Sequence, residues 1–292
     1  MTKTIALPTG VAVPALGLGT WKMGESASTR KQEIAAIRFA IDCGYRLFDT
    51  AEMYGEGGAE TILGKALADA MRANAVKRED VIVASKVYPH HADTKGVIAA
   101  CERSRQRLGL DAIDIYLLHW RGAVPLAETV DAFEAIKASG AIRHWGVSNF
   151  DVHDLHELEA LDTARALSRR RPASLTNQDY YALDQRGPEF SLLAYQRSLH
   201  MPTRAYCPLG RGALAQDRTL AKLGEARGVS AAQIALAWVM RHSDVIAIPK
   251  AVDHAHLSEN IAAADIVLSE AELALIDAAF KPPSKKEPLA MT

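Results

Sequence analysis

The chain has 292 residues, of which 49% are hydrophobic and 24% are charged, and its formal net charge is −1. This balance is typical of a globular protein, and without a basic block it argues against binding to nucleic acid or an anionic membrane. Three widely spaced cysteines favour a reducing compartment over a disulfide framework. Because we find no signal-peptide pattern and no apolar run of membrane-spanning length, we expect a cytoplasmic protein. We also expect it to be a monomer.

Short apolar runs alternate with helical patterns along the chain. Helical spacing is clear in 30–44, where Ile34, Ile37 and Ile41 recur and Gly44 suits a helix end. Strand followed by helix, repeated eight times, predicts an α/β protein with a (β/α)8 TIM barrel. An open doubly wound sheet is the alternative, which eight units without a long linker disfavour. The expected strands, buried on both faces, are 15–20, 47–51, 81–87, 113–119, 142–149, 173–178, 202–208 and 245–250.

Two segments lie outside this repeat. Residues 4–14 are expected to form a hairpin across one end of the barrel, and 269–280 an extra helix before a Pro/Lys-rich tail. No shift in composition marks a boundary, so we predict that 1–292 forms a single domain.

Polar residues end three neighbouring predicted strands. The second strand ends in Asp49 with Tyr54 in the loop beyond it, the third ends near Lys86, and the fourth ends in His119. Alone, these are ordinary: a helix cap, a loop tyrosine, a lysine reaching solvent and a core histidine. Together they meet at one barrel mouth, where burying four titratable groups is costly unless they pair. The sequence therefore predicts a catalytic site there.

Such a group supports proton transfer to an oxygen. The usual tyrosine pKa, about 10, is too high for an efficient acid at neutral pH. A lysine ammonium about 4 Å away, at an effective dielectric constant of about 20, would lower the pKa of Tyr54 by about three at most. Asp49 would keep Lys86 charged, and neutral His119 would orient a substrate carbonyl. We predict no metal site, because the His, Asp and Cys residues lack zinc-type spacing.

Eight short motifs occur in order along nearly the whole chain. They are GLGTW (17–21), FDTAEMYG (48–55), SKV (85–87), LLHW (117–120), GVSNF (146–150), NQ (177–178), AYCPLG (205–210) and IPK (248–250). In this order the motifs resemble the aldo-keto reductases, and the wider pattern is similar to bacterial YeaE-type methylglyoxal reductases. The resemblance implies NAD(P)H-dependent carbonyl reduction by Asp49, Tyr54, Lys86 and His119, with Tyr54 as the general acid.

The resemblance also implies that a nicotinamide dinucleotide lies across the barrel mouth, without a Rossmann fingerprint, which is absent here. Ser148, Asn149 and Gln178 would hold the carboxamide, Tyr206 would stack on the ring, and Lys250 would meet the 2′-phosphate. The full set implied to bind the cofactor is Gly19, Thr20, Trp21, Asp49, Ser148, Asn149, Gln178, Tyr206, Leu209, Gly210, Lys250, His256, Glu259 and Asn260. We also expect the long stretch 209–244 to carry a loop over the cofactor.

The phosphate end departs from the commonest family pattern. The family often has Ser or Thr after IPK and Arg six residues beyond the lysine, where this chain has Ala251 and His256. Asp253 between them would repel a phosphate that it faced. Lys250 is retained, and the methylglyoxal reductase subgroup is described as NADPH-using. We predict NADPH and leave NADH open.

The substrate side is less specific. The loop after the fourth strand and the tail are short, so we expect an open mouth. Arg121 would attract a carboxylate or a dicarbonyl, although such an arginine is more often a solvated rim residue. The expected wall is Trp21, Tyr54, Tyr88, His119, Trp120 and Arg121. Small aldehydes and 2-oxoaldehydes such as methylglyoxal are the expected substrates.

Two other functions remain open from the sequence. A nucleotide-binding regulatory or accessory subunit with little turnover would keep the cofactor residues, as some members of the family do. A Schiff-base aldolase would use Lys86 or Lys250, but the sixth predicted strand has no lysine and Lys86 has acidic and phenolic neighbours suited to a charged role. Turnover on a panel of aldehydes distinguishes the accessory subunit from a reductase, and borohydride trapping that labels Lys86 would indicate the aldolase.

Overall fold

The computed structural model describes residues 3–7, 9–164 and 174–292, and it confirms the predicted barrel. Neighbouring strands are all parallel and follow chain order around the sheet. A bridge between Leu16 and Ala247 joins the first strand segment to the last and closes the barrel. The strands are β3 (Leu18–Gly19), β4 (Leu47–Asp49), β5 (Ile82–Val87), β6 (Ile113–Leu118), β7 (Ile142–Ser148), β8 (Asn177–Tyr180), β9 (Thr203–Tyr206) and β10 (Val245–Ile248).

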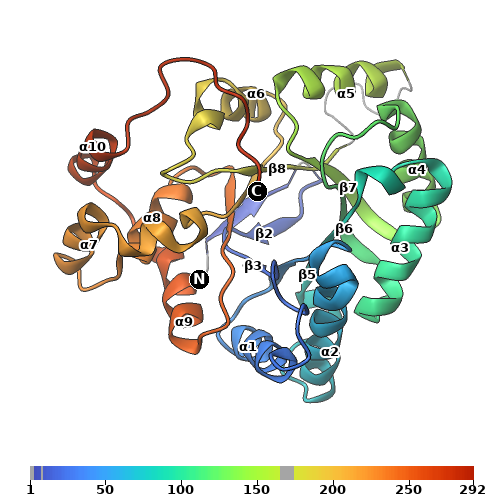
Figure 1. Cartoon of the computed structure of the whole chain (residues 1–292), viewed down its shortest axis with the longest axis horizontal. Coiled ribbons are helices and arrows are strands. Elements are labelled where there is room, and N and C mark those ends of the chain that lie inside the picture. Colours follow the sequence, from blue (N-terminus) through green and yellow to red (C-terminus); the bar gives the residue numbers. More distant parts are fainter. Residues whose placement is uncertain (1–2, 8, 165–173) are drawn as a thin grey trace.

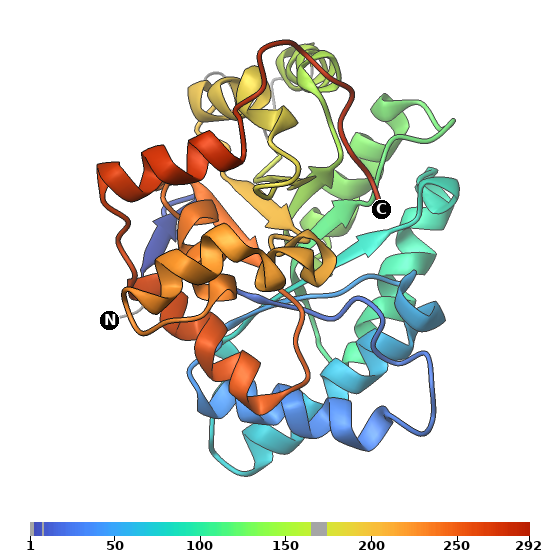
Figure 2. The same ribbon diagram turned by 60° about the vertical axis from the view of Figure 1, so that its left-hand side comes forward.

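Helices surround the strands, as Figures 1 and 2 show. Side chains at the N-caps fix several helix starts: Ser230 and Ser269 each accept from the backbone three residues on, with a reciprocal Gln or Glu. The helices are α1 (Arg30–Asp42), α2 (Gly58–Arg72), α3 (Thr94–Leu108), α4 (Leu126–Ala138), α5 (Val152–Ala164), α6 (Leu192–Ser198), α7 (Arg218–Glu225), α8 (Ala231–Val239), α9 (His254–Ala262) and α10 (Glu270–Ala279). Within the described residues, no helix is long and apolar enough to span a membrane.

The sixth barrel strand lies further along the chain than we predicted. The apolar pattern placed it at 173–178, of which residue 173 lies outside the described residues, but the strand β8 begins at Asn177 and ends at Tyr180. All four of its residues are buried although three are polar. Gln178 donates to Asp49 inside the barrel, while Asp179 accepts from Gln196 of helix α6. Hydrogen bonds on both faces therefore replace the apolar contacts that a hydrophobicity pattern detects.

Both segments outside the repeat form as predicted. The strands β1 (Thr4–Ala6) and β2 (Ala12–Pro14) pair antiparallel, with Ile5 and Val13 buried. In Figure 1 this hairpin lies behind the barrel, at the end opposite the C-terminus. Helix α10 is the extra helix, and the tail after it runs back to the barrel mouth (Figure 2).

Candidate active site

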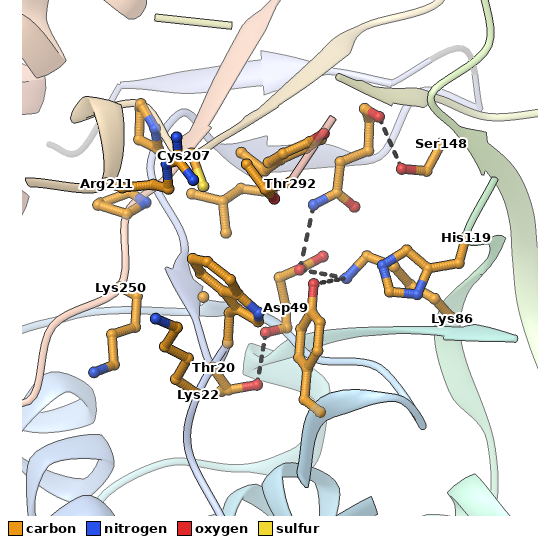
Figure 3. Close-up of a pocket in the computed structure, with 18 of the residues that line it drawn as sticks. Thr20, Lys22, Asp49, Lys86, His119, Ser148, Cys207, Arg211, Lys250 and Thr292 are labelled. Carbon is orange, nitrogen blue, oxygen red and sulfur yellow. Dashed lines mark hydrogen bonds and ion pairs between the residues drawn. The ribbon is translucent and has the colours of Figure 1, made fainter. Parts of the chain in front are cut away.

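A cavity of about 340 Å³ opens at the mouth of the barrel, a size suited to a ligand. In Figure 3, Lys86 and His119 lie on one side of it, and Lys22 and Lys250 lie on the other. The predicted site residues that line the cavity are Gly19, Thr20, Trp21, Asp49, Tyr54, Lys86, His119, Trp120, Ser148, Asn149, Gln178, Tyr206, Leu209 and Lys250. The four predicted catalytic residues are thus brought together.

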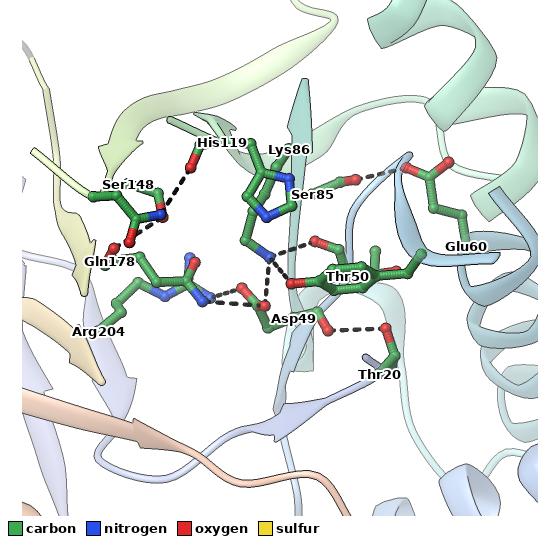
Figure 4. Close-up of polar contacts among 12 residues, drawn as sticks. Thr20, Asp49, Thr50, Glu60, Ser85, Lys86, His119, Ser148, Gln178 and Arg204 are labelled. Atoms are coloured by element: carbon green, nitrogen blue, oxygen red, sulfur yellow. Dashed lines mark hydrogen bonds and ion pairs between the residues drawn. The ribbon is translucent and has the colours of Figure 1, made fainter. Parts of the chain in front are cut away.

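The Asp49 carboxylate is the centre of a buried polar cluster (Figure 4). It accepts from Lys86 Nζ at 2.6 Å and, through its other oxygen, from Arg204 Nη2 at 2.8 Å. Gln178 Nε2 adds a third contact at 3.3 Å. Lys86 Nζ also donates to the Thr50 carbonyl at 2.7 Å. A buried carboxylate with this many donors is held in one orientation.

Tyr54 meets the cluster through its hydroxyl. Lys86 Nζ lies 3.4 Å from Tyr54 Oη, which gives the ammonium three oxygen partners for its three protons. The His119 ring lies edge-on to the phenol ring, with centroids 5.7 Å apart, and its buried Nδ1 has no partner among the described residues. Two groups able to contact a carbonyl oxygen therefore face the same part of the cavity.

The electrostatics of Tyr54 differ from our prediction. Burial raises the pKa of the Tyr54 phenol well above its usual value, and Asp49 raises it further, whereas Arg204 lowers it. The expected lowering by Lys86 is not among these effects, and burial lowers the pKa of Lys86 itself, against the opposing charge of Asp49. Burial, followed by the charge of Lys86, lowers the pKa of His119 well below its usual value. The free site thus holds a protonated phenol beside a neutral imidazole at neutral pH.

A row of amide and hydroxyl groups continues from the cluster along strands β7 and β8. Ser148 Oγ donates to the Gln178 carbonyl at 2.8 Å, and Asn149 Nδ2 donates to Ser148 Oγ at 3.1 Å. Tyr206 Oη donates to Asn149 Oδ1 at 2.9 Å and holds its ring against the cavity. Gln178 Oε1 is buried and has no partner among the described residues. This free acceptor fits the amide protons of a nicotinamide carboxamide.

Comparison with known proteins identifies the family of this chain. Residues 15–281 match the model of the aldo/keto reductase family. The chain belongs to the aldo/keto reductase family. Methylglyoxal reductase YeaE of Escherichia coli strain K12 is 44% identical over 294 residues, which cover 99% of each protein. Glyoxal reductase of Bacillus subtilis is 32% identical, over 95% of this chain and 93% of that protein. A solved aldo-keto reductase from Klebsiella pneumoniae in complex with NADPH is 45% identical, with a TM-score of 0.91 and complete coverage of both chains.

Several binding residues predicted for this aldo/keto reductase lie outside the cavity lining. Tyr88 Oη donates to Glu56 at 3.0 Å, and Arg121 forms an ion pair with Glu157 at 3.1 Å, so its charge is already compensated. Glu259 accepts from Ser230 Oγ. The predicted residues that do not line the cavity are Tyr88, Arg121, Gly210, His256, Glu259 and Asn260.

Asp253 has a structural role at the phosphate end. Its carboxylate accepts from the backbone N–H groups of Ala255 and His256 and caps the N-terminus of helix α9. These bonds lower the pKa of Asp253. The Asp253 carboxylate therefore points toward the N-terminus of helix α9, where the helix dipole stabilises its negative charge. Lys250, by contrast, is exposed and lines the cavity.

Sequence reasoning missed three basic residues of the site. Lys22 and Arg211 line the cavity on the side of Lys250, and Arg204 lies inside the barrel. Lys22 follows the GTW motif directly, and Arg204 precedes Tyr206 by two residues and so shares its face of strand β9. The positions of Lys22 and Arg204 in the sequence could therefore have indicated that they belong to the site.

The tail covers part of the mouth that we expected to be open. The tail after helix α10 returns to the cavity, where Met291 and Thr292 form part of its lining. Lys286 pairs with Asp151 at 2.9 Å and holds the tail on the side of helix α5. A short tail does not imply an uncovered site, because its path depends on such contacts.

Proposed function

We propose that the chain reduces small aldehydes and 2-oxoaldehydes such as methylglyoxal to alcohols, with NADPH as cofactor and Tyr54 as the general acid. The observation that carries this is the position of Lys86 Nζ between the Asp49 carboxylate and the Tyr54 hydroxyl, at the floor of a cavity. The relatives support the substrate class, since one is a methylglyoxal reductase and another a glyoxal reductase. The NADPH complex of the Klebsiella protein supports the cofactor.

When bound, the reduced nicotinamide supplies a hydride to the carbonyl carbon. Tyr54 Oη gives its proton to the carbonyl oxygen, and the Lys86 ammonium stabilises the phenolate that remains. Asp49 holds Lys86 in place, and neutral His119 hydrogen-bonds the carbonyl and fixes its direction. The phenolate then regains a proton from solvent.

The residues of the cavity fit this cofactor. Gln178 offers a buried free acceptor for the carboxamide, and Tyr206 offers a ring beside it. At the other side, Lys22, Arg211 and Lys250 provide three cations suited to phosphate groups. The 2′-phosphate of NADPH would give Lys250 an anionic partner, which is the basis for preferring NADPH to NADH.

The first experiment tests the acid. Tyr54→Phe removes the hydroxyl and keeps the ring, so we expect kcat for methylglyoxal to fall by at least about a thousandfold while NADPH still quenches tryptophan fluorescence. Tyr195→Phe is the matched control, because this phenol lies on helix α6 and contacts His156 and Glu159 outside the cavity. Retained turnover in Tyr54→Phe would show that another group donates the proton.

The second experiment tests the class of function. Initial rates with NADPH and NADH are measured against methylglyoxal, simple aldehydes and sugars. We expect the highest kcat/KM for methylglyoxal with NADPH. Tight NADPH binding with negligible turnover on every carbonyl would instead indicate a nucleotide-binding accessory subunit.

A further inference from the structure

Arg204 is a charged residue inside the barrel with no role in the chemistry described so far. It lies on strand β9 with only 1% of its side chain exposed. Among the described residues, its guanidinium makes one hydrogen bond, from Nη2 to Asp49 Oδ2 at 2.8 Å. Nε and Nη1 are buried and have no hydrogen-bond partner among the described residues. An arginine left this incompletely bonded is costly to bury, so packing alone does not account for it.

The charges around Asp49 show what Arg204 changes. Asp49 and Lys86 form an ion pair at 2.6 Å, and their two charges sum to zero. Arg204 on the second carboxylate oxygen adds one uncancelled positive charge. The cluster of Asp49, Lys86, Arg204 and a neutral phenol then carries a net charge of +1. It becomes neutral when Tyr54 loses its proton.

We propose that Arg204 is a positioning and charge-balancing residue, which neutralises Asp49 and so leaves the Lys86 ammonium free to stabilise the Tyr54 phenolate formed during reduction. This inference rests on the proposed role of Tyr54 as the acid. The direction of the electrostatic effect agrees, because Arg204 lowers the pKa of Tyr54 against the opposing effect of burial. Arg204 would contact neither substrate nor cofactor, and its effect on Tyr54 would depend on its ion pair with Asp49.

The other charged and titratable groups around Tyr54 do not replace Arg204. Burial and the charge of Lys86 lower the pKa of His119, so that it is neutral at neutral pH. Burial also raises the pKa of Tyr206 and Cys207, so neither is ionised there. The groups that face Tyr54 or its lysine from the surrounding elements are Asp49, Glu60, Lys86, His119, Arg204, Tyr206 and Cys207.

The test is the pH profile of reduction in Arg204→Met, whose side chain has similar length and no charge. Reduction needs protonated Tyr54, so its rate falls as pH rises through the pKa of the phenol. Without Arg204 that pKa is higher, and we expect the alkaline limb of the kcat profile to move to higher pH than in the wild type. A weaker acid also slows proton transfer, so we expect kcat at pH 7 to fall by about tenfold with KM nearly unchanged.

Rescue and control variants separate charge from packing. Arg204→Lys restores the charge and should bring the limb and kcat back toward wild type, while Arg204→Gln keeps hydrogen bonding to Asp49 and should behave like Arg204→Met. Arg78→Met is the matched control, because Arg78 also bonds a strand aspartate, Asp114, at 2.8 Å but lies away from the cavity. It should leave the profile unmoved.

A second measurement needs no cofactor. In cofactor-free protein labelled with carbon-13 tyrosine, the Tyr54 resonance, assigned with Tyr54→Phe, should shift in Arg204→Met and return in Arg204→Lys. A kcat loss that is equal in all three Arg204 variants, with an unmoved limb, would overturn the proposal. If Tyr54→Phe is inactive while the Arg204→Met profile matches wild type, only the role of Arg204 fails. If Tyr54→Phe retains activity, the proposed function itself fails.

Discussion

The barrel carries, near each of its two ends, an aspartate that holds two basic side chains, and the two clusters differ in their access to water. At the mouth, Asp49 pairs with Lys86 at 2.6 Å and with Arg204 at 2.8 Å. Both basic side chains are only 1% exposed. Neither charge can be solvated, so each depends on Asp49 for its compensation.

At the other end, Asp114 is the second residue of strand β6 and pairs with Arg78 at 2.8 Å and Arg143 at 3.0 Å. These arginine side chains are 25% and 53% exposed. Asp114 also accepts from the Val83 backbone N–H at 2.8 Å. Water solvates the exposed parts of the two arginines, and the Val83 N–H stabilises the Asp114 carboxylate. This arrangement is typical of a cluster that stabilises the fold.

Residue type alone therefore does not separate a catalytic from a structural ion pair. An aspartate paired with two cations forms a cluster with partly solvated arginines at one end and a fully buried cluster beside the cavity at the other. Burial makes the electrostatic effect of each charge large and also makes its loss costly. The largest effects of substitution should therefore appear at the mouth.

The strongest test exchanges the two aspartates for asparagine. Asp49→Asn leaves two buried cations without a counter-charge, so we expect kcat to fall by about a hundredfold to a thousandfold and the free energy of unfolding to fall by about 3–5 kcal/mol. Asp114→Asn should leave kcat within about twofold and cost about 1–2 kcal/mol. Steady-state kinetics and urea unfolding measure both. Equal loss of kcat in the two variants would remove the distinction between the ends.

A third aspartate, Asp179, is buried without a cation beside it among the described residues. Within the part of the chain that the structure describes, the Asp179 side chain on strand β8 accepts from the amides of Asn177 and Gln196. Burial raises its pKa to about 7. The folded protein therefore binds a proton that the unfolded chain has released above pH ~4, and stability falls as pH rises from there through 7. By pH 8 the cost is on the order of 4 kcal/mol.

Asp179→Asn removes this titration. We expect the variant to gain stability relative to wild type as pH rises from 5 to 8. At pH 5 it should be no more stable than wild type, because an asparagine at position 179 can accept only one of the hydrogen bonds from Asn177 and Gln196. Urea unfolding of both proteins at each pH measures the difference. A difference that stays constant with pH would mean that Asp179 is already ionised at pH 5.

Much of the mouth could be predicted because barrel geometry brings strand ends together. Asp49, Lys86 and His119 follow three neighbouring strands, so their convergence needed only the strand order. Arg204 was missed because it lies inside strand β9, directly before the AYCPLG motif, where an apolar residue was expected. Only its spacing of two from Tyr206 indicated that it points inward.

The return of the tail could not be predicted in the same way. Met291 and Thr292 reach the cavity through contacts with elements far away in the chain, such as the pair between Lys286 and Asp151. No local periodicity encodes such contacts. The pKa direction of Tyr54 was also missed, because it depends on how fully the hydroxyl is buried rather than on the presence of a nearby lysine.

Lys250 extends the comparison to an exposed cation at the edge of the mouth. Because it is solvated, removing its charge should affect binding of NADPH but not the chemical step. We expect Lys250→Met to raise KM for NADPH by about tenfold, with KM for NADH and kcat within about twofold of wild type. Lys95→Met, an exposed lysine on helix α3, is the control. Equal increases for both cofactors would show that Lys250 does not meet the 2′-phosphate.

The smallest effect is expected at the tail, which lies in the cavity lining but keeps contact with water. Met291 is 53% exposed, so the apolar area it covers is worth about 1 kcal/mol, which limits the effect of its loss to about fivefold. Deleting Met291 and Thr292 should change KM for methylglyoxal within that range and leave kcat and the Tyr54 pH limb unchanged. Lys286→Met loosens the tail without shortening it and should change KM less, in the same direction. A large loss of kcat on truncation would show that the tail contributes to catalysis as strongly as the buried cluster around Asp49. Exposure to water would then not predict which parts of the mouth matter for kcat.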